Sequence, residues 1–296
     1  MRNFEVSTDS TSDWYANEYE EYGVSVGKLG YIFDKNDVIT EHLDDFKCYQ
    51  DYVDFYNTIR SGAMPKTSIL NVDAHVEMFK NLAQKGVKNV LHIAQSYGLS
   101  PTLDNANKAI EIVKEEFPDI NFKAMESRTT TYAEGMLVKL ACKLRDEGKT
   151  LDEALQILED TKMKIQHFVI VDDLMYLKKG GRISGPKAVM GTLLNLKPII
   201  EFSKEGKLEV VRKEFGTKKA MRSVIEEAKK YTRNSLLPNG VIVHTDNEPL
   251  AKEMQALVKQ AFGYEPEIRI IGPIIGSHLG PNCVAYAFIS NEERPL

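Results

Sequence analysis

Five side chains in three short polar stretches are the candidates for chemistry in this sequence: Thr67, Ser68, Ser96, Ser100 and His278. Each stretch combines small polar residues with glycine or proline and falls where a strand is expected to begin or end. Hydroxyl and imidazole groups hydrogen-bond carboxylates and phosphates without the help of a lysine. If the three stretches meet in the fold, they form a binding site for an anion.

The stretch from residue 91 to residue 102, LHIAQSYGLSPT, is the most informative of the three. An apolar run at residues 90–94 predicts a buried strand, and Pro101 suits the first turn of the helix that follows. The carboxyl end of a strand beside a helix N-terminus is where open α/β folds bind anionic ligands. An ordinary turn, in which the serine and threonine only cap the helix, explains the same residues.

His278 lies between glycines, in a segment (residues 272–281) that we expect to be a loop. It either belongs to the anion site or hydrogen-bonds a nearby carbonyl group. A serine esterase or acyltransferase, with Ser96 or Ser100 as nucleophile and His278 as base, is the enzymatic alternative. Neither serine lies in a G-x-S-x-G motif and no third catalytic residue is evident, so a binding protein is favoured over an enzyme.

Composition and motifs argue against several other classes of protein. The net charge of −5 disfavours general nucleic-acid binding, and no Walker A motif supports binding of ATP. The six histidines and three cysteines fit no metal-ligand spacing, so we expect no metal and no cofactor. The absence of a signal core and of any long apolar run predicts a cytoplasmic protein without a membrane span; transient contact with a membrane surface stays open.

The first half of the chain alternates strands with amphipathic helices. Strands are predicted at residues 4–6, 90–94 and 121–125, and helices at 103–117 and 132–148. This alternation is typical of a parallel sheet wrapped by helices. The run STDSTSD at residues 7–13 predicts a helix cap, with Trp14 beginning the helix. Residues 64–68 are expected to form a polar loop.

A strand predicted at residues 167–171 opens a second unit, so we divide the chain into two α/β domains, residues 1–164 and 165–296. A hairpin at 197–202 and 208–213, with further helices and strands, indicates a mixed sheet with helices in the second domain. Two shorter helical pieces are predicted at 174–179 and 186–194. The fold class is therefore α/β in both domains, with the ligand expected between them.

A basic stretch lies within the second domain. No acidic residue occurs between Leu174 and Ile200, whereas this stretch contains Lys178, Lys179, Arg182, Lys187 and Lys197. It is either a solvated face or a docking surface for an acidic partner or a phosphate. Arg182 stands out because it follows two glycines, whose backbone freedom helps to present the guanidinium group.

Six motifs in order resemble the DegV family, the bacterial fatty-acid-binding proteins that serve as the lipid-binding subunit of fatty acid kinase. They are STDSTSDW (7–14), PKTS (65–68), SYGLSPT (96–102), YLKKGGRISG (176–185), NLKPII (195–200) and IGPIIGSHLGP (271–281). Each motif is weak alone, but together they cover essentially the whole chain.

The resemblance implies a carrier that encloses a long-chain fatty acid between two α/β domains. A separate ATP-dependent kinase would phosphorylate the acid, and the acyl phosphate would enter phospholipid synthesis. By position, Thr67, Ser96 and His278 would hold the carboxylate, with Ser68 and Ser100 in support. Arg182 would belong to the kinase-docking surface.

The sequence departs from the family pattern in two places. Ile69, Leu70 and Asn71 follow Thr67-Ser68, where the family has Gln-Pro-Ser. In the SYGLSPT stretch, Tyr97 replaces a serine and Pro101 replaces a glycine. Tyr97 either moves a hydroxyl by about the width of its ring or fills the pocket mouth. A fatty acid remains the favoured ligand, with another amphipathic acid as the alternative.

Overall fold

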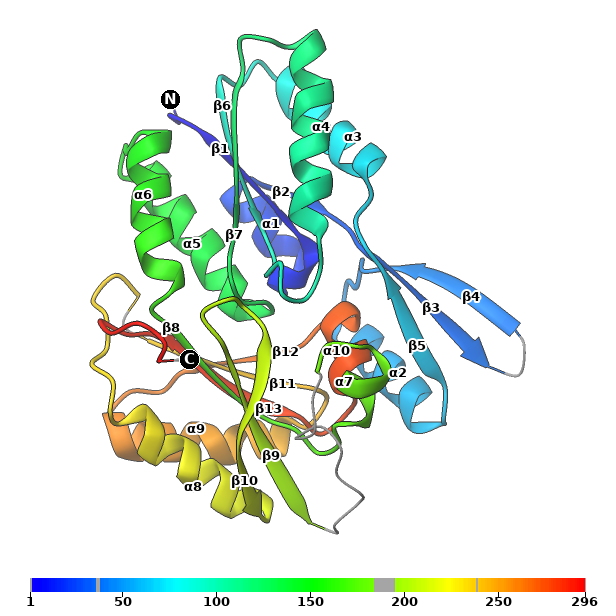
Figure 1. Cartoon of the computed structure of the whole chain (residues 1–296), viewed down its shortest axis with the longest axis vertical. Helices are drawn as coiled ribbons and strands as arrows, with labels where there is room; N and C mark the ends of the chain where they lie inside the picture. The colour runs from blue at the N-terminus through cyan, green and yellow to red at the C-terminus, as the bar shows by residue number, and fades with distance from the viewer. Residues whose placement is uncertain (1, 36–37, 184–194, 238, 296) are drawn as a thin grey trace.

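The computed structural model describes residues 2–35, 38–183, 195–237 and 239–295. A parallel sheet with the strand order β2-β1-β6-β7 forms the centre of the first half (Figure 1). Its strands are β1 (Glu5–Asp9), β2 (Val24–Gly27), β6 (Asn89–Ala94) and β7 (Asn121–Glu126). The parallel sheet predicted from the alternation of strands and helices is confirmed.

Helices cover both faces of this parallel sheet. They are α1 (Ala16–Tyr22), α3 (Val72–Gln84), α4 (Thr102–Glu116), α5 (Tyr132–Asp146) and α6 (Leu151–Lys162). Successive residues of a strand point to opposite faces. Val90 of β6 therefore shares one apolar core with Phe79 of α3, whereas Leu91 shares another with Leu137 of α5. The parallel strands are apolar on both faces for this reason.

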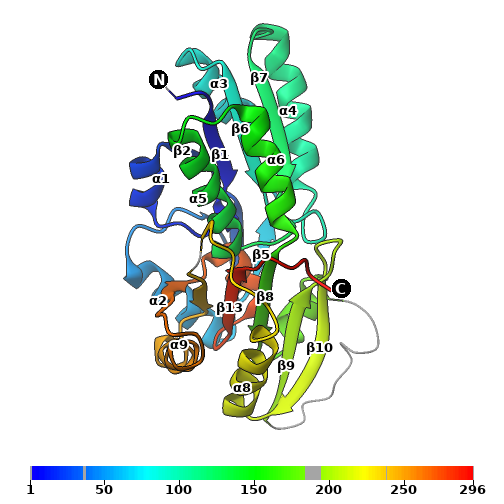
Figure 2. The same cartoon turned by 90° about the vertical axis from the view of Figure 1, so that its left-hand side faces the viewer.

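A mixed sheet with the strand order β10-β9-β8-β13-β11-β12 forms the second half. Its strands are β8 (Ile165–Ile170), β9 (Leu196–Phe202), β10 (Leu208–Phe215), β11 (Val241–His244), β12 (Glu267–Ile270) and β13 (Val284–Ile289). Neighbouring strands run antiparallel except β11 and β12. Helices α8 (Thr217–Ala228) and α9 (Glu248–Phe262) cover its outer face (Figure 2). The mixed sheet with helices is thus confirmed.

A third, antiparallel sheet corrects the prediction for residues 64–68. It joins β3 (Gly30–Lys35), β4 (Val38–Leu43) and β5 (Met64–Ser68), with β3 in the middle. The expected polar loop is strand β5, in which Thr67 pairs with Tyr31. Pro65 hid the strand in the sequence, because proline is tolerated only at positions such as this edge strand. Helix α2 (Tyr49–Arg60) packs Phe55 against the rings of Tyr31 and Phe33.

Two further predictions were wrong. Residues 272–281 are not a loop but contain helix α10 (Pro273–Leu279), which begins after Gly272 and ends before Gly280. Proline in the first turn and glycine after the last are the usual signals of a short helix. Trp14 does not begin a helix, because Asp9 caps a short turn at Ser10–Ser12 and α1 starts only at Ala16.

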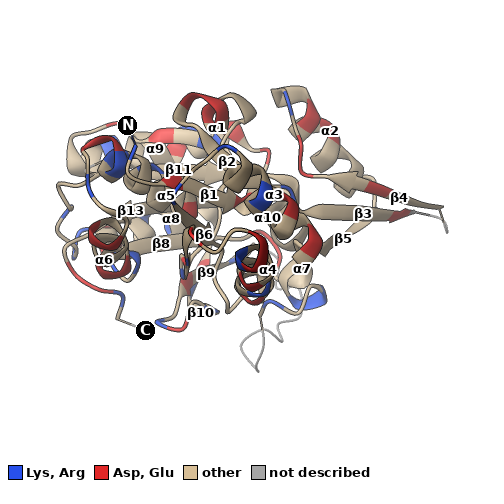
Figure 3. Cartoon of the chain, turned by 90° about the horizontal axis from the view of Figure 1, so that it is seen from above, with Lys and Arg blue, Asp and Glu red and all other residues tan. Residues whose placement is uncertain are grey.

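The segment around Arg182 is described only in part. Helix α7 (Met175–Lys179) confirms the prediction at residues 174–179. The helix predicted at residues 186–194 and Lys187 of the basic stretch lie outside the described residues. Lysines and arginines colour the end of α7 blue in Figure 3.

The two halves meet over a shared apolar core. Val169 and Ile200 of the mixed sheet belong to the same buried cluster as Leu91 and Ile93 of the parallel sheet. An ion pair also joins the halves, since the guanidinium of Arg269 contacts both carboxylate oxygens of Glu18 at 2.5 and 2.6 Å. Within the described ranges, no helix is long and apolar enough to cross a bilayer.

Candidate functional site

A cavity of about 280 Å³ lies where the two halves meet. Its floor comes from the loops that follow β6 and β7, at the carboxyl ends of the parallel strands, where α/β folds commonly bind ligands. The inner face of the mixed sheet and helix α10 form its walls. Most of the lining is apolar: Leu29, Ile69, Leu99, Pro101, Val169, Leu177, Phe202, Leu208, Ile271, Ile274, Ile275, Leu279 and Ala285. The polar lining residues are Thr67, Ser68, Gln95, Ser100, Thr130, Thr131, His167, Arg182 and His278.

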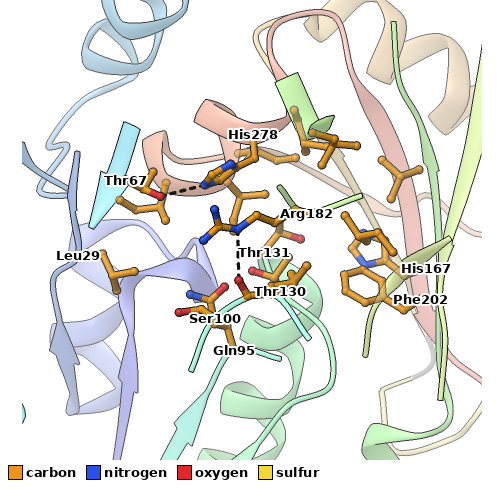
Figure 4. Close-up of a pocket in the computed structure, with 18 of the residues that line it drawn as sticks. Leu29, Thr67, Gln95, Ser100, Thr130, Thr131, His167, Arg182, Phe202 and His278 are labelled. Carbon is orange, nitrogen blue, oxygen red and sulfur yellow. Dashed lines mark hydrogen bonds between the residues drawn. The ribbon is translucent and has the colours of Figure 1, made fainter. Parts of the chain in front are cut away.

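Thr67 and His278 form the polar pair at one side of the cavity (Figure 4). The Thr67 hydroxyl lies 2.9 Å from His278 Nε2, although the two residues are 211 positions apart in the chain. Strand β5 presents Thr67 and helix α10 presents His278. Burial and, to a smaller extent, the charge of Arg182 lower the pKa of His278 to about 4. The imidazole is therefore neutral at neutral pH and has one N–H to donate.

Arg182 projects into the same side of the cavity. Its Nε donates a hydrogen bond of 3.3 Å to the carbonyl oxygen of Leu99 (Figure 4). Burial lowers the pKa of this arginine, but the group stays charged at any physiological pH. A half-buried cation beside the Thr67–His278 pair attracts an anion. Arg182 was predicted for partner docking, and the structure places it in the wall of the cavity.

The loop after β6 contributes fewer of its predicted hydroxyl groups to the cavity than expected. Ser100 lines the cavity, as does Ser68 at the end of β5. The Ser96 hydroxyl instead donates a hydrogen bond of 2.8 Å to the carbonyl of Gly206, in the turn between β9 and β10. Gly98 packs so closely on Gly206 that a Cβ at this position would collide with its backbone. Ser96 therefore holds the loop against the second half and is absent from the described lining.

The two substitutions in the SYGLSPT stretch, Tyr97 and Pro101, have different places in the structure. Tyr97 is 52% exposed, and its hydroxyl donates a hydrogen bond of 3.1 Å to Asp104. Tyr97 thus does not fill the pocket mouth. Pro101 lines the cavity and precedes α4.

Four polar residues of the cavity were missed by sequence reasoning, and one of them, Gln95, directly follows β6. Thr130 and Thr131 lie in the loop after β7, and His167 lies in β8. The polar run SRTTT at residues 127–131 follows an expected strand, which is part of the signal that identified the other loops. His167 gave no such signal, because it sits within an apolar strand.

The arrangement suits the binding of an amphipathic anion. The cavity offers apolar walls over most of its length and hydrogen-bond donors with one cation at one side. His278 hydrogen-bonds Thr67, and among the described residues no hydrogen bond joins it to Ser96 or Ser100. The described residues also contain no group of three or more acidic, histidine or cysteine side chains arranged for a metal ion.

Fold and cavity together define an α/β protein with a mainly apolar pocket between two sheets. The sequence model of the uncharacterised DegV family matches residues 3–291. The chain belongs to the DegV family. A DegV domain-containing protein from Clostridium perfringens is 31% identical over 296 residues, which cover 100% of both chains. Another from Lactococcus lactis is 31% identical over 98% of this chain and 99% of that protein.

Solved structures are similar over the whole chain. A DegV lipid-binding protein from Thermotoga maritima has a TM-score of 0.84 over 99% of this chain and 100% of that one, and at 24% identity it shows the shared fold. A fatty-acid-binding DegV family protein from Thermus thermophilus is 26% identical, with a TM-score of 0.81 over 98% and 100% of the two chains. One from Streptococcus agalactiae is 26% identical, with a TM-score of 0.80 over 99% and 100%.

Proposed function

We propose that this protein is a carrier that binds a long-chain fatty acid in the cavity between its two halves. The observation that carries the proposal is the cavity itself, which is apolar over most of its lining and ends at the Thr67–His278 pair. Relatives of the same fold bind fatty acids. We propose residues 1–164 and 165–296 as the two domains that close on the ligand.

The apolar tail supplies most of the affinity. Burying roughly 16 carbons at about 0.8 kcal/mol per methylene contributes about 12 kcal/mol. Lost freedom of the ligand and desolvation of polar groups cost about 4 kcal/mol or more. The remainder is ample for tight binding, so the polar side of the cavity determines the head group and its position.

The carboxylate is proposed to lie against Thr67 and His278, with Ser68 and Ser100 in support. An ionised carboxylate buried without partners costs several kcal/mol. The hydroxyl of Thr67, the N–H of neutral His278 and the nearby charge of Arg182 offset that cost. Ser96 acts through the loop it anchors to Gly206, because its hydroxyl is already used there.

The fatty acid is proposed to be the substrate of a separate ATP-dependent kinase, which forms the acyl phosphate for phospholipid synthesis. The chain itself is not the catalyst in this scheme. Because ATP is the phosphoryl donor, we propose that this phosphorylation takes place in the cytoplasm. Arg182 supports this proposal, since it lies next to the proposed carboxylate and adjoins the lysines of α7.

Organic extraction and mass spectrometry of natively purified protein test the binding proposal. The expected result is a stoichiometric fatty acid in the extract. Lipid-free protein that also fails to bind added oleate in a calorimeter contradicts the proposal.

The kinase proposal needs a second experiment, with the fatty acid kinase of the same cell. Arg182→Ala is expected to reduce acyl-phosphate formation at saturating fatty acid, and Lys252→Ala, which removes an exposed lysine of α9 outside the basic stretch, serves as the control. Unchanged phosphorylation of the oleate-loaded Arg182→Ala protein contradicts a docking role. Loss of oleate binding in proportion to phosphorylation would instead assign Arg182 to the carboxylate site.

A further inference from the structure

Two threonine hydroxyls in the cavity have no partner. Thr130 and Thr131 are 3% and 2% exposed, and both line the cavity. The Oγ1 atom of each is buried and has no hydrogen-bond partner among the described residues. Buried hydroxyl groups are normally hydrogen-bonded, so two neighbouring exceptions on one cavity wall call for a ligand atom.

The backbone of Thr131 supports this reading. Thr131 precedes α5 in the position of its N-cap, where a threonine side chain usually accepts a hydrogen bond from the first turn of the helix. Here its side chain makes no such bond, and its backbone has φ of 60° and ψ of −158°. A positive φ is costly for a β-branched residue and recurs at ligand sites. The Thr131 hydroxyl therefore does not cap the helix and is available to a ligand in the cavity.

His167 adds a polar group on the far side of the cavity. Figure 4 places it, with Phe202, across the cavity from Thr67. The His167 ring stacks on Phe202 at a centroid distance of 5.2 Å, and its Nδ1 lies 3.3 Å from the Thr129 hydroxyl. Burial lowers the pKa of His167 to about 3, so the ring is neutral. The wall away from the Thr67–His278 pair is thus more polar than a plain hydrocarbon tail requires.

We propose that the preferred ligand carries an oxygen along its chain, a hydroxyl or keto group that hydrogen-bonds Thr130 and Thr131. The inference rests on the fatty-acid binding proposed above and names the kind of acid. An unsubstituted chain places methylenes against both hydroxyls and leaves them unsatisfied. A chain hydroxyl satisfies them, and this difference favours the oxygenated acid by about fivefold or more.

Competitive binding of palmitate and a set of monohydroxypalmitates, with the hydroxyl moved along the chain, tests the proposal. For the wild-type protein, one isomer is expected to bind at least about fivefold more tightly than palmitate. Thr130→Val and Thr131→Val keep the side-chain shape and are expected to abolish that preference. Thr102→Val is the matched control, because the Thr102 hydroxyl is equally buried and unpartnered but lies outside the cavity lining.

The outcomes separate this inference from the proposed function. If palmitate binds as tightly as every hydroxylated isomer, the inference is overturned, and ordered water is then the partner of the two threonine hydroxyls. Fatty-acid binding itself would stand. An equal loss of affinity for all acids in the valine variants would place the two threonines at the carboxylate and also overturn it. Binding of none of the acids would refute both proposals. Where a valine variant fails to fold, oxygenated acids in the native lipid extract support the inference and their absence refutes it.

Discussion

The two ends of helix α10 adjoin two polar regions in which burial shifts the pKa values of the titratable groups in opposite directions. Near its last turn, His278 hydrogen-bonds Thr67 in the cavity. At its start, the backbone N–H of Gly272 donates a 3.0 Å hydrogen bond to Asp13, which lies close to Asp44. The first region contains donors and a nearby cation, whereas the second contains two carboxyl groups.

In both regions burial favours the neutral form of the titratable groups, a base in the first region and acids in the second. Burial lowers the pKa of His278 to about 4, which leaves a neutral donor. Burial raises the pKa of Asp44 to about 7 and, with the charge of Asp44, raises that of Asp13 well above its usual value. Asp13 and Asp44 also face a cavity, of about 820 Å³. Only the region around His278 and Arg182 is suited to a carboxylate, because it offers a hydrogen-bond donor and a positive charge, whereas ionised Asp13 or Asp44 would repel a third carboxylate.

The largest effect that tests this comparison is expected for His278→Leu. The substitution removes the N–H donor and puts an apolar side chain of similar bulk in its place. Palmitate affinity should fall by about 1.5–3 kcal/mol, because a hydrogen bond to a charged group is lost. Isothermal titration calorimetry measures this change, with Asp44→Asn as the control that should bind normally. An equal loss of palmitate affinity in both variants would contradict the distinction between the two regions.

Gly272→Ala tests the region at the start of α10. A Cβ at this position would lie 2.6 Å from Asp13 Oδ1, and moving this oxygen away disturbs its hydrogen bond from the Gly272 N–H. Unfolding free energy should therefore fall by about 2 kcal/mol through overpacking. Urea denaturation gives the change. Full stability of the variant would show that Asp13 is free to shift.

The pH dependence of stability isolates Asp44. Its folded-state pKa of about 7 lies above the ordinary 3.8, so the folded protein binds the extra proton between these values. The contribution of Asp44 to stability is complete below about pH 4 and is lost as pH rises through about 7. Buried histidines such as His278 act in the opposite sense, so wild type and Asp44→Asn must be compared at each pH.

The Asn variant cannot ionise, so its stability relative to wild type should rise as pH increases from about 4 to about 7. The expected gain is about 1–2 kcal/mol, since partial exposure of Asp44 screens the full shift. Thermal denaturation across this range measures it. A difference between the two proteins that does not change with pH would show that Asp44 is ionised throughout.

The smallest effect is expected for Tyr97→Phe, which changes one departure from the family pattern. The variant loses only the exposed hydrogen bond to Asp104. Stability should change by less than about 0.5 kcal/mol, and palmitate affinity should stay the same. A marked loss of affinity would place the Tyr97 hydroxyl at the ligand.

Much of the fold was predictable from local patterns. Apolar runs such as residues 90–94, alternating with amphipathic helices, predicted the parallel sheet because burial on both faces demands that composition. The strand Met64–Ser68 was not predictable, since its polar sequence becomes a strand only beside β3. The short helix α10 carried proline and glycine signals, but its few residues gave no helical period.

The sequence by itself determined which residue types were available for an anion site and that they follow strands or flank glycines. Only the tertiary structure decided which of them meet. It joined Thr67 to His278 across 211 positions, turned Ser96 toward Gly206 and added Thr130, Thr131 and His167 to the cavity. The physical reason is that local patterns encode which segments are buried, whereas contacts between distant loops depend on how the two sheets pack against each other.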